Sequence, residues 1–543
     1  KINQTSMIHA SGNDIKMITG EGFKSIIPDY IFDTFTKKEY TINDSLLLNL
    51  TQSDLIPRYY ANVNTSNFDN LESNNFGFSL SSGTSYLYDG QYANIAVQAY
   101  YLKENIEAMI NLDEYIPINN PSLTINDWLS METLLSKLSY LSISNNKKTI
   151  FLNGGRLKSL TFGHGQLLYN YSNSYNYPIM QRTGLFMHIS PLNKKSYLID
   201  FFISDLSQIL NGGGLFGMHG SLFLSKFFPL TIGYGYIVDL DQYSEYDSNI
   251  SIDSEISASE IDLEYIVSQS KERKVSIISE LDAIFFPYEL RYSRVDDNPA
   301  NSFKTRKGTW GSMFGGKVVY ESGHEISLSA HYNDPLYTPY YFSSTYDFEK
   351  VRTIAYNENN PSHKLNNKDN EDFLIDFCDH LGSNDDEFPS DCDNGEILYL
   401  SKELYPLFSS TDFVYSMIGG SVKYDYNYYS IRGVSFSAMY LSENKSDSNN
   451  SYYLISAEMF YNGDFWFERL DNLKLYFHRN FTNSSSGDNG TENMMAGIGF
   501  DFKITSTLDF HFDWQNVFYD IDSDADVDKI NSYAIEFKYD FIK

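Results

Sequence analysis

Five aspartates at every second position form the strongest candidate for metal chemistry in this chain of 543 residues. They are Asp520, Asp522, Asp524, Asp526 and Asp528. Carboxylate oxygens are the hard ligands that Ca²⁺ prefers, and the stretch DIDSDAD has the ligand spacing of the first half of a calcium-binding loop. The central glycine and the distal glutamate of such a loop are missing. Two interpretations stay open, a Ca²⁺ site or a solvated acidic loop, and no cofactor is predicted to be required.

The two cysteines, Cys378 and Cys392, lie in one acidic stretch, DFCDHLGSNDDEFPSDCDNGE. An oxidising compartment would let them pair across a loop of about fourteen residues, and we expect this disulfide. A cysteine-based metal site is the alternative, but no third or fourth soft ligand lies nearby in the sequence. A weaker candidate for a cation site lies beside Cys392 and comprises Asp391, Asp393, Asn394, Gly395 and Glu396.

Motifs for catalysis are missing from the sequence. It contains no Gly-x-Ser-x-Gly elbow, no His-Glu-x-x-His pair and no phosphate-binding P-loop. Serine, histidine and aspartate are plentiful, but their order alone does not identify a spatial triad. We therefore expect that the protein is not an enzyme, with a membrane-bound hydrolase as the alternative.

The elements that must position the ionisable residues are long strands. Successive side chains of a strand point to opposite faces, and in LDFHFDW (508–514) three ionisable residues alternate with four aromatic or aliphatic ones. The same alternation occurs at 106–113, 275–285, 326–332, 418–428, 496–504 and 533–541. Strands of about ten to twelve residues exceed the five or six that are usual in soluble proteins.

Long and short connections alternate between these strands. From the C-terminus backwards, YDIDSDADVDKIN is long, ITST is short, TNSSSGDNGTEN is long and the region at NGD is short. Long loops at one end and tight turns at the other are typical of outer-membrane barrels. One exception is NDWLSMETLLSKLSYL, whose leucines recur at helical spacing after a cap at Asn126 or Asp127, so we predict a helix in a loop or in the lumen.

Composition excludes several classes of protein. A net charge of −31 makes nucleic acid an unsuitable partner, because binding requires lysine and arginine to neutralise phosphates. No run of eighteen apolar residues occurs, which excludes a transmembrane helix. The chain begins at Lys1 without a methionine or an apolar signal core, as expected of an exported protein after processing. We expect an N-terminal segment, 1–75, that forms a plug or extra strands, and a barrel at 76–543 with a long extracellular loop at about 333–412.

On these strands and loops the chain resembles a Gram-negative outer-membrane β-barrel of the porin or transporter type, over about residues 76–543. Its final stretch, YAIEFKYDFIK, is similar to the assembly signal of such barrels. The resemblance implies an all-β, transmembrane, antiparallel up-and-down barrel of about 18 strands (range 16–20). It also implies a location in the outer membrane, in contact with lipid and lipopolysaccharide, with the long loops extracellular.

In such a barrel one face of each strand meets lipid and the other lines the lumen. The expected lumen-lining residues are Glu107, Asp113, Glu280, Asp282, Glu325, His331, Lys423, Asp425, Asp501, Lys503, Asp509, His511 and Asp513. The glycine-rich stretch FGHGQLLYNYSNSYNYPIMQRTG predicts a constriction, with His164 and Arg182 as its candidate residues. A bulge at a barrel corner is the alternative there, and both interpretations also apply to Gly212, Gly213 and Gly214.

Two functions from different classes fit this barrel. The first is a channel for small hydrophilic solutes, narrowed by inward-folded loops and selective for cations, because carboxylates outnumber lysines at the expected lumen positions. The second is a surface scaffold or adhesin whose acidic loops bind divalent cations, lipopolysaccharide or a protein partner. A homo-oligomer is compatible with both. The strand number favours the channel, since barrels of this width leave an aqueous lumen unless a plug fills it.

Overall fold

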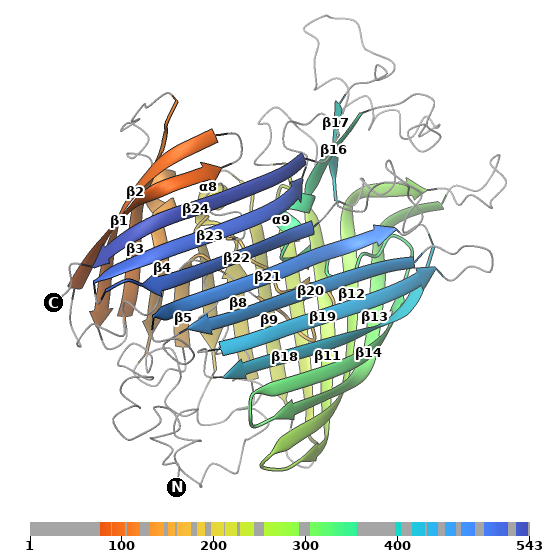
Figure 1. Cartoon of the computed structure of the whole chain (residues 1–543). Coiled ribbons are helices and arrows are strands. Elements are labelled where there is room, and N and C mark those ends of the chain that lie inside the picture. The colour runs from red at the N-terminus through yellow and green to blue at the C-terminus, as the bar shows by residue number, and fades with distance from the viewer. Residues whose placement is uncertain are drawn as a thin grey trace, which may run out of the picture.

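The computed structural model of the protein is a closed barrel of 20 antiparallel strands (Figure 1). Its strands, in chain order, are β1 (Phe76–Leu87), β2 (Gly90–Lys103), β3 (Ile106–Pro117), β4 (Leu138–Ser144), β5 (Ile150–Gly155), β7 (Gly184–Ile189), β8 (Tyr197–Ile203), β9 (Leu215–Phe223), β10 (Leu230–Asp239), β11 (Ile256–Gln269), β12 (Arg273–Tyr292), β13 (Lys304–Tyr320), β14 (His324–Asn333), β18 (Met417–Tyr428), β19 (Arg432–Glu443), β20 (Ser451–Asn462), β21 (Leu470–Asn483), β22 (Met494–Lys503), β23 (Leu508–Tyr519) and β24 (Asp528–Asp540). The number lies within the range expected from the sequence and close to the predicted value.

The structure describes residues 76–87, 90–103, 106–119, 131–145, 150–157, 160–174, 182–190, 197–210, 212–224, 228–243, 255–292, 304–355, 397–402, 415–428, 432–443, 451–462, 469–483, 494–505, 507–519 and 528–540. Several sequence-based predictions lie outside these residues, and they stay predictions. They are the N-terminal segment 1–75, the cysteines Cys378 and Cys392, the candidate cation site at Asp391–Glu396, the aspartates Asp520, Asp522, Asp524 and Asp526, and the terminal aromatic Phe541.

The barrel closes where its first and last strands meet. β1 pairs with β2 on one side and with β24 on the other, with Ser79 opposite Asp540 and Tyr86 opposite Tyr533. Closure satisfies the backbone donors and acceptors that an open sheet edge would leave unpaired, which is what a bilayer requires of a sheet that crosses it. Because the number of strands is even, β1 starts and β24 ends at the same edge of the barrel.

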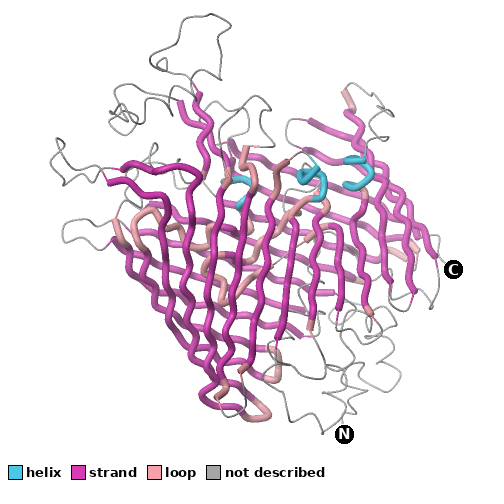
Figure 2. Tube along the Cα trace, turned by 180° about the vertical axis from the view of Figure 1, so that it is seen from behind, coloured by secondary structure: helices cyan, strands magenta, loops and turns pink. Residues whose placement is uncertain are grey.

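The two edges of the barrel differ. Tight reversals such as 270–272 and 321–323 lie at one edge, and the connections that leave β5 and β14 lie at the other. β16 (Val351–Ala355) and β17 (Ile397–Ser401) pair with each other and extend beyond the barrel at that second edge, as Figures 1 and 2 show. The alternation of short and long connections predicted from the sequence therefore holds for these strands.

The outer surface of the barrel is apolar around its circumference. Large hydrophobic side chains point outward on strands from β1 to β24, and Phe314, Leu328 and Tyr440 are 62%, 61% and 56% exposed. A soluble monomer does not leave so much contiguous apolar surface in water, whereas lipid accommodates it. The described helices include none that is long and apolar enough to cross a bilayer. The apolar outer surface belongs to the strands, which are the elements that span the membrane.

Three short helices lie among the described residues, α7 (Met131–Ser136), α8 (Leu206–Leu210) and α9 (Tyr346–Glu349). The predicted helix of NDWLSMETLLSKLSYL is wrong beyond Ser136, because Leu138 and Leu141 belong to β4. Strand β4 pairs with β3 and β5 on its two sides. Ladder hydrogen bonds to two neighbours outweigh the weak preference of a leucine-rich stretch for helix.

Candidate functional site

Two segments fold from the second edge of the barrel into its lumen. We call residues 160–174, between β5 and β7, the first inner segment, and residues 334–350, after β14, the second inner segment. Their short strands β6 (Leu168–Tyr169) and β15 (Phe342–Ser343) pair in parallel. The backbone N–H of Tyr340 also donates to the carbonyl of Gln166, at 2.7 Å. The two inner segments therefore form one body inside the barrel.

The first inner segment reaches the far wall of the lumen. Backbone N–H groups of His164 and Gln166 donate to the two carboxylate oxygens of Glu280 on β12, at 2.6 and 2.9 Å. Farther along, Asn170 Nδ2 donates to Glu458 Oε1 on β20, at 2.8 Å. β5, where the segment leaves the wall, and β20 lie on nearly opposite sides of the strand order. The first inner segment therefore crosses the lumen.

Lys423 on β18 fixes both inner segments. Its ammonium group donates to the carbonyls of His164 and Gly165, at 2.6 and 3.0 Å. It also lies 4.3 Å from the ring centroid of Tyr169 and 5.0 Å from that of Tyr340, one ring from each segment. Cation–π contacts of this kind add to the two hydrogen bonds, and they are stronger in a desolvated site than at a surface.

The second inner segment is held by tyrosines. Tyr337 donates its hydroxyl to Asp282 Oδ2 on β12, at 3.1 Å, and Tyr346 donates to Asp239 Oδ2 on β10, at 2.9 Å. Burial, with the Asp282 carboxylate nearby, raises the pKa of Tyr337 well above its usual value, so its hydroxyl remains a donor. Arg182, a predicted constriction residue, forms an ion pair with Asp347 and so ties the start of β7 to this segment.

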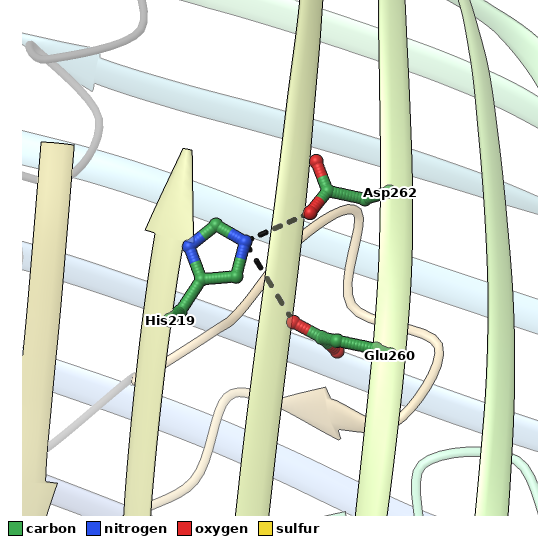
Figure 3. A group of neighbouring side chains, drawn as sticks. All are labelled: His219, Glu260 and Asp262. Atoms are coloured by element: carbon green, nitrogen blue, oxygen red, sulfur yellow. Dashed lines mark hydrogen bonds and ion pairs between the residues drawn. The ribbon is translucent and has the colours of Figure 1, made fainter. Parts of the chain in front are cut away.

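Below the inner segments, the inward face of β11 and β12 carries five buried carboxylates. Glu264 pairs with Lys274, and the other four, which we call the acidic cluster, are Glu260, Asp262, Glu280 and Asp282. In the antiparallel register Glu260 is opposite Asp282 and Asp262 is opposite Glu280. A histidine of β9 completes the group, because His219 Nε2 lies 2.8 Å from Asp262 Oδ2 and 3.8 Å from Glu260 Oε1 (Figure 3).

His219 reaches the acidic cluster across the intervening strand β10. β10 presents Gly233 and Gly235 to the lumen at this level, and a Cβ atom on either residue would collide with the carboxylate of Asp262 or of Glu260. Glycine is needed here for close approach of side chains over a backbone. The stretch IGYGYI of β10 is therefore part of the site although neither glycine carries a functional group.

Gly233→Ala is expected to destabilise the barrel by about 1 to 3 kcal/mol, because the added methyl group must displace the Asp262 carboxylate from a packed interior. Gly220→Ala on β9 is the matched control, since a Cβ atom there meets nothing nearer than 3.7 Å. Urea titration of the folded fraction, followed by electrophoretic mobility without heating, measures both. Equal midpoints for the two variants would contradict this account of β10.

The part of the wall formed by β22, β23 and β24 carries inward side chains of alternating sign. Lys503, Asp509 and Lys538 face one another across three strands, and so do Asp501, His511 and Glu536. His511 Nδ1 lies 2.6 Å from Asp501 Oδ1. The predicted lumen residues of these strands are therefore partly neutralised by cross-strand partners.

The other predicted lumen residues lie on inward faces and have individual partners. Glu107 accepts from the Tyr140 hydroxyl at 3.2 Å, and Asp113 pairs with Lys137 at 3.1 Å. Glu325 lies 3.9 Å from Lys317 Nζ, and His331 Nε2 lies 2.7 Å from Ser421 Oγ. Asp425 and Asp513 are half-buried on β18 and β23. Of the aspartates proposed for calcium, Asp528 is the first residue of β24 and pairs with Tyr519.

Sequence reasoning missed part of the site. Glu260, Asp262 and Glu264 alternate with apolar residues in ISASEIDLEYIV, the same signal that identified Glu280 and Asp282 on the next strand. Buried histidines beside carboxylates were also missed, namely His188 with Asp200, His219 with Asp262 and His478 with Glu458. No local sequence pattern links each histidine to its carboxylate, because the two residues of each pair lie on different strands.

No family model matches the chain, and no curated protein matches it. Among solved structures it is similar to CdiB from Acinetobacter baumannii (8% identity, TM-score 0.24), covering 86% of this chain and 60% of that one. It is also similar to OccK3 from Pseudomonas aeruginosa (10%, TM-score 0.32, 86% and 95% covered) and to Wzi, an outer-membrane protein of Escherichia coli (10%, TM-score 0.30, 93% and 90% covered). Likeness at this level carries no argument about function. The closed sheet and its apolar exterior make this chain a transmembrane β-barrel.

Proposed function

We propose that the barrel is an outer-membrane channel for small hydrophilic solutes, narrowed by the two inner segments and selective for cations. The observation that carries the proposal is a difference in exposure between inward-facing side chains. Glu280, under the first inner segment, is 1% exposed, whereas the side chain of His511 on β23 is 26% exposed although it also points inward. Asp513 and Glu536 also point inward and are half-buried, whereas Asp501 and Asp509 are buried. The half-buried positions support a wet passage along β23 and β24, between the wall and the inner segments.

Charge in this passage supports a moderate preference for cations. Asp501, Asp509 and Glu536 face His511, Lys503 and Lys538 on neighbouring strands, whereas Asp513 lies opposite Gly499 and Ala534. Carboxylates therefore exceed lysines without forming a continuous acidic ring. A water-filled pore lined by an excess of one sign concentrates counter-ions. The role proposed here is transport, and no catalytic step is part of it.

Reversal potentials of the full chain in planar bilayers, measured across a KCl gradient, test this proposal. We expect K⁺ to permeate better than Cl⁻, and we expect Asp513→Lys to move the reversal potential toward that of an anion channel. Glu272→Lys is the control, because it makes the same charge change in an exposed tight turn at the barrel edge. An anion-selective wild type, or the same shift in both variants, would contradict the assignment of the passage.

The inner segments also favour a second candidate, a surface scaffold or adhesin anchored by a plugged barrel. They contact β10, β12, β18 and β20 through buried groups, which is more than a constriction needs. In that case the partner would be a divalent cation, lipopolysaccharide or a protein, bound by the acidic loops. The same recordings separate the two functions, since a scaffold predicts no conductance from a correctly folded barrel.

A further inference from the structure

The acidic cluster contains carboxylate oxygens that no described residue satisfies. Both side-chain oxygens of Glu260 are buried without a hydrogen-bond partner among the described residues, and the same holds for Asp282 Oδ1. Glu260 is 0% exposed and Asp282 is 1% exposed. Buried polar atoms are almost always paired, and a buried carboxylate without a donor costs far more free energy than a neutral group.

Positive charge near these oxygens is insufficient to balance them. Among the described residues, His219 Nε2 forms the ion-pair contact with Glu260, at 3.8 Å, and it lies closer to Asp262, at 2.8 Å. Lys274 and Lys317 lie next to Glu264, at 2.8 and 3.7 Å. Within the part of the chain that the structure describes, the acidic cluster thus has one imidazole within ion-pair distance, and Lys423 interacts electrostatically with Glu280. The remaining like charges must be offset by bound protons or by a cation.

The oxygens converge closely enough for a metal ion. One oxygen from each of Glu260, Glu280 and Asp282 lies within 4.8 Å of the others, and Glu260 is also within reach of His219 and Asp262. Glu280 accepts two backbone N–H groups and Asp282 Oδ2 accepts the Tyr337 hydroxyl, so these carboxylates are held in place. Fixed carboxylates with free lone pairs are what hard divalent cations bind.

We propose that Glu260, Glu280 and Asp282 bind one hard divalent cation of the Ca²⁺, Mg²⁺ or Mn²⁺ class beneath the inner segments. Oxygen-only ligation is favoured because the unpartnered atoms belong to Glu260 and Asp282, whereas His219 and Asp262 already satisfy each other. Glu280 connects the cation to the backbone of the first inner segment, and Asp282 connects it to Tyr337 of the second. The cation therefore fastens both inner segments to the wall, whether or not the barrel conducts.

The test uses the full chain, folded in detergent micelles, stripped with EDTA and then equilibrated with Mn²⁺. We expect one bound Mn²⁺ whose affinity depends on Glu260. Electron paramagnetic resonance should detect it, and Ca²⁺ should displace it. Glu260→Gln keeps the shape of the side chain and removes its charge, and it should raise the Kd at least tenfold. Asp501→Asn is the matched control, because Asp501 is also buried beside a histidine but lies on β22, away from the acidic cluster.

Further variants keep the outcome decisive. Asp282→Asn should weaken binding as Glu260→Gln does, which covers the case in which one of the two fails to fold. His219→Gln should leave the Kd within a few fold of the wild type. Equal losses in His219→Gln and Glu260→Gln would overturn the oxygen-only set. Binding lost in Asp524→Asn but kept in Glu260→Gln would assign the metal to the acidic loop, and no Mn²⁺ binding by the wild type would mean that the acidic cluster shares protons instead.

Discussion

Phe512→Arg is expected to abolish most folded barrel, whereas the same substitution at the adjacent His511 is expected to leave assembly intact. Phe512 is near the middle of β23 on the lipid-facing side, with Phe500 and Ile535 directly across on the neighbouring strands. A charged arginine on the lipid face costs about 2 to 4 kcal/mol near the bilayer midplane. That cost is a large fraction of the net stability of a typical folded domain, about 5 to 15 kcal/mol.

His511→Arg makes a sharp control because it tests the same strand one residue away. The new side chain faces the lumen between Asp501 and Glu536, so its positive charge keeps partners of opposite sign on both neighbouring strands. Both variants are refolded into lipid vesicles, and the heat-modifiable band on unheated gels gives the folded fraction. Equal losses would contradict the assignment of the two faces of β23.

The sequence predicted the faces of the strands better than their number. Alternation of apolar and ionisable residues over long strands such as β12 and β23 is a local property, so it is visible without a structure. Strands β5, β7 and β8 cover only six or seven residues each, which gives too few alternations for a confident count. The pattern therefore indicated about 18 strands, whereas the barrel has 20.

The sequence predicted which residues of the candidate site point inward, but it did not predict which of them contact one another. Glu280 and Asp282 were assigned to the lumen from their spacing, but Glu280 is covered by backbone N–H groups of His164 and Gln166, more than a hundred residues earlier in the chain. Asp282 is covered by Tyr337, about fifty residues later. Likewise, His219 meets Asp262 only because Gly233 lies between them on β10. Contacts of this kind follow from strand register, which a single sequence does not reveal.

Replacing the first inner segment, residues 160–174, with a short glycine-serine linker is expected to raise single-channel conductance several-fold. The segment crosses the lumen and is held by Glu280, Lys423 and Glu458, so its removal widens the narrowest part of the passage. The barrel itself should still assemble, because its closure depends on the wall strands and not on the segment. The side chains of Glu280, Lys423 and Glu458 would become exposed by this replacement, and water in the lumen would solvate them.

The matched control shortens a connection of the wall at 484–493, between β21 and β22, by the same kind of linker. Its conductance should equal that of the wild type if the effect belongs to the lumen. Lys423→Met is a milder test, because it removes only the group that fixes both inner segments to β18, and it should increase current fluctuations between open levels. Conductance that appears only after the segment is replaced would instead identify it as a plug, and an unchanged conductance in a correctly folded variant would show that residues 160–174 do not limit the passage.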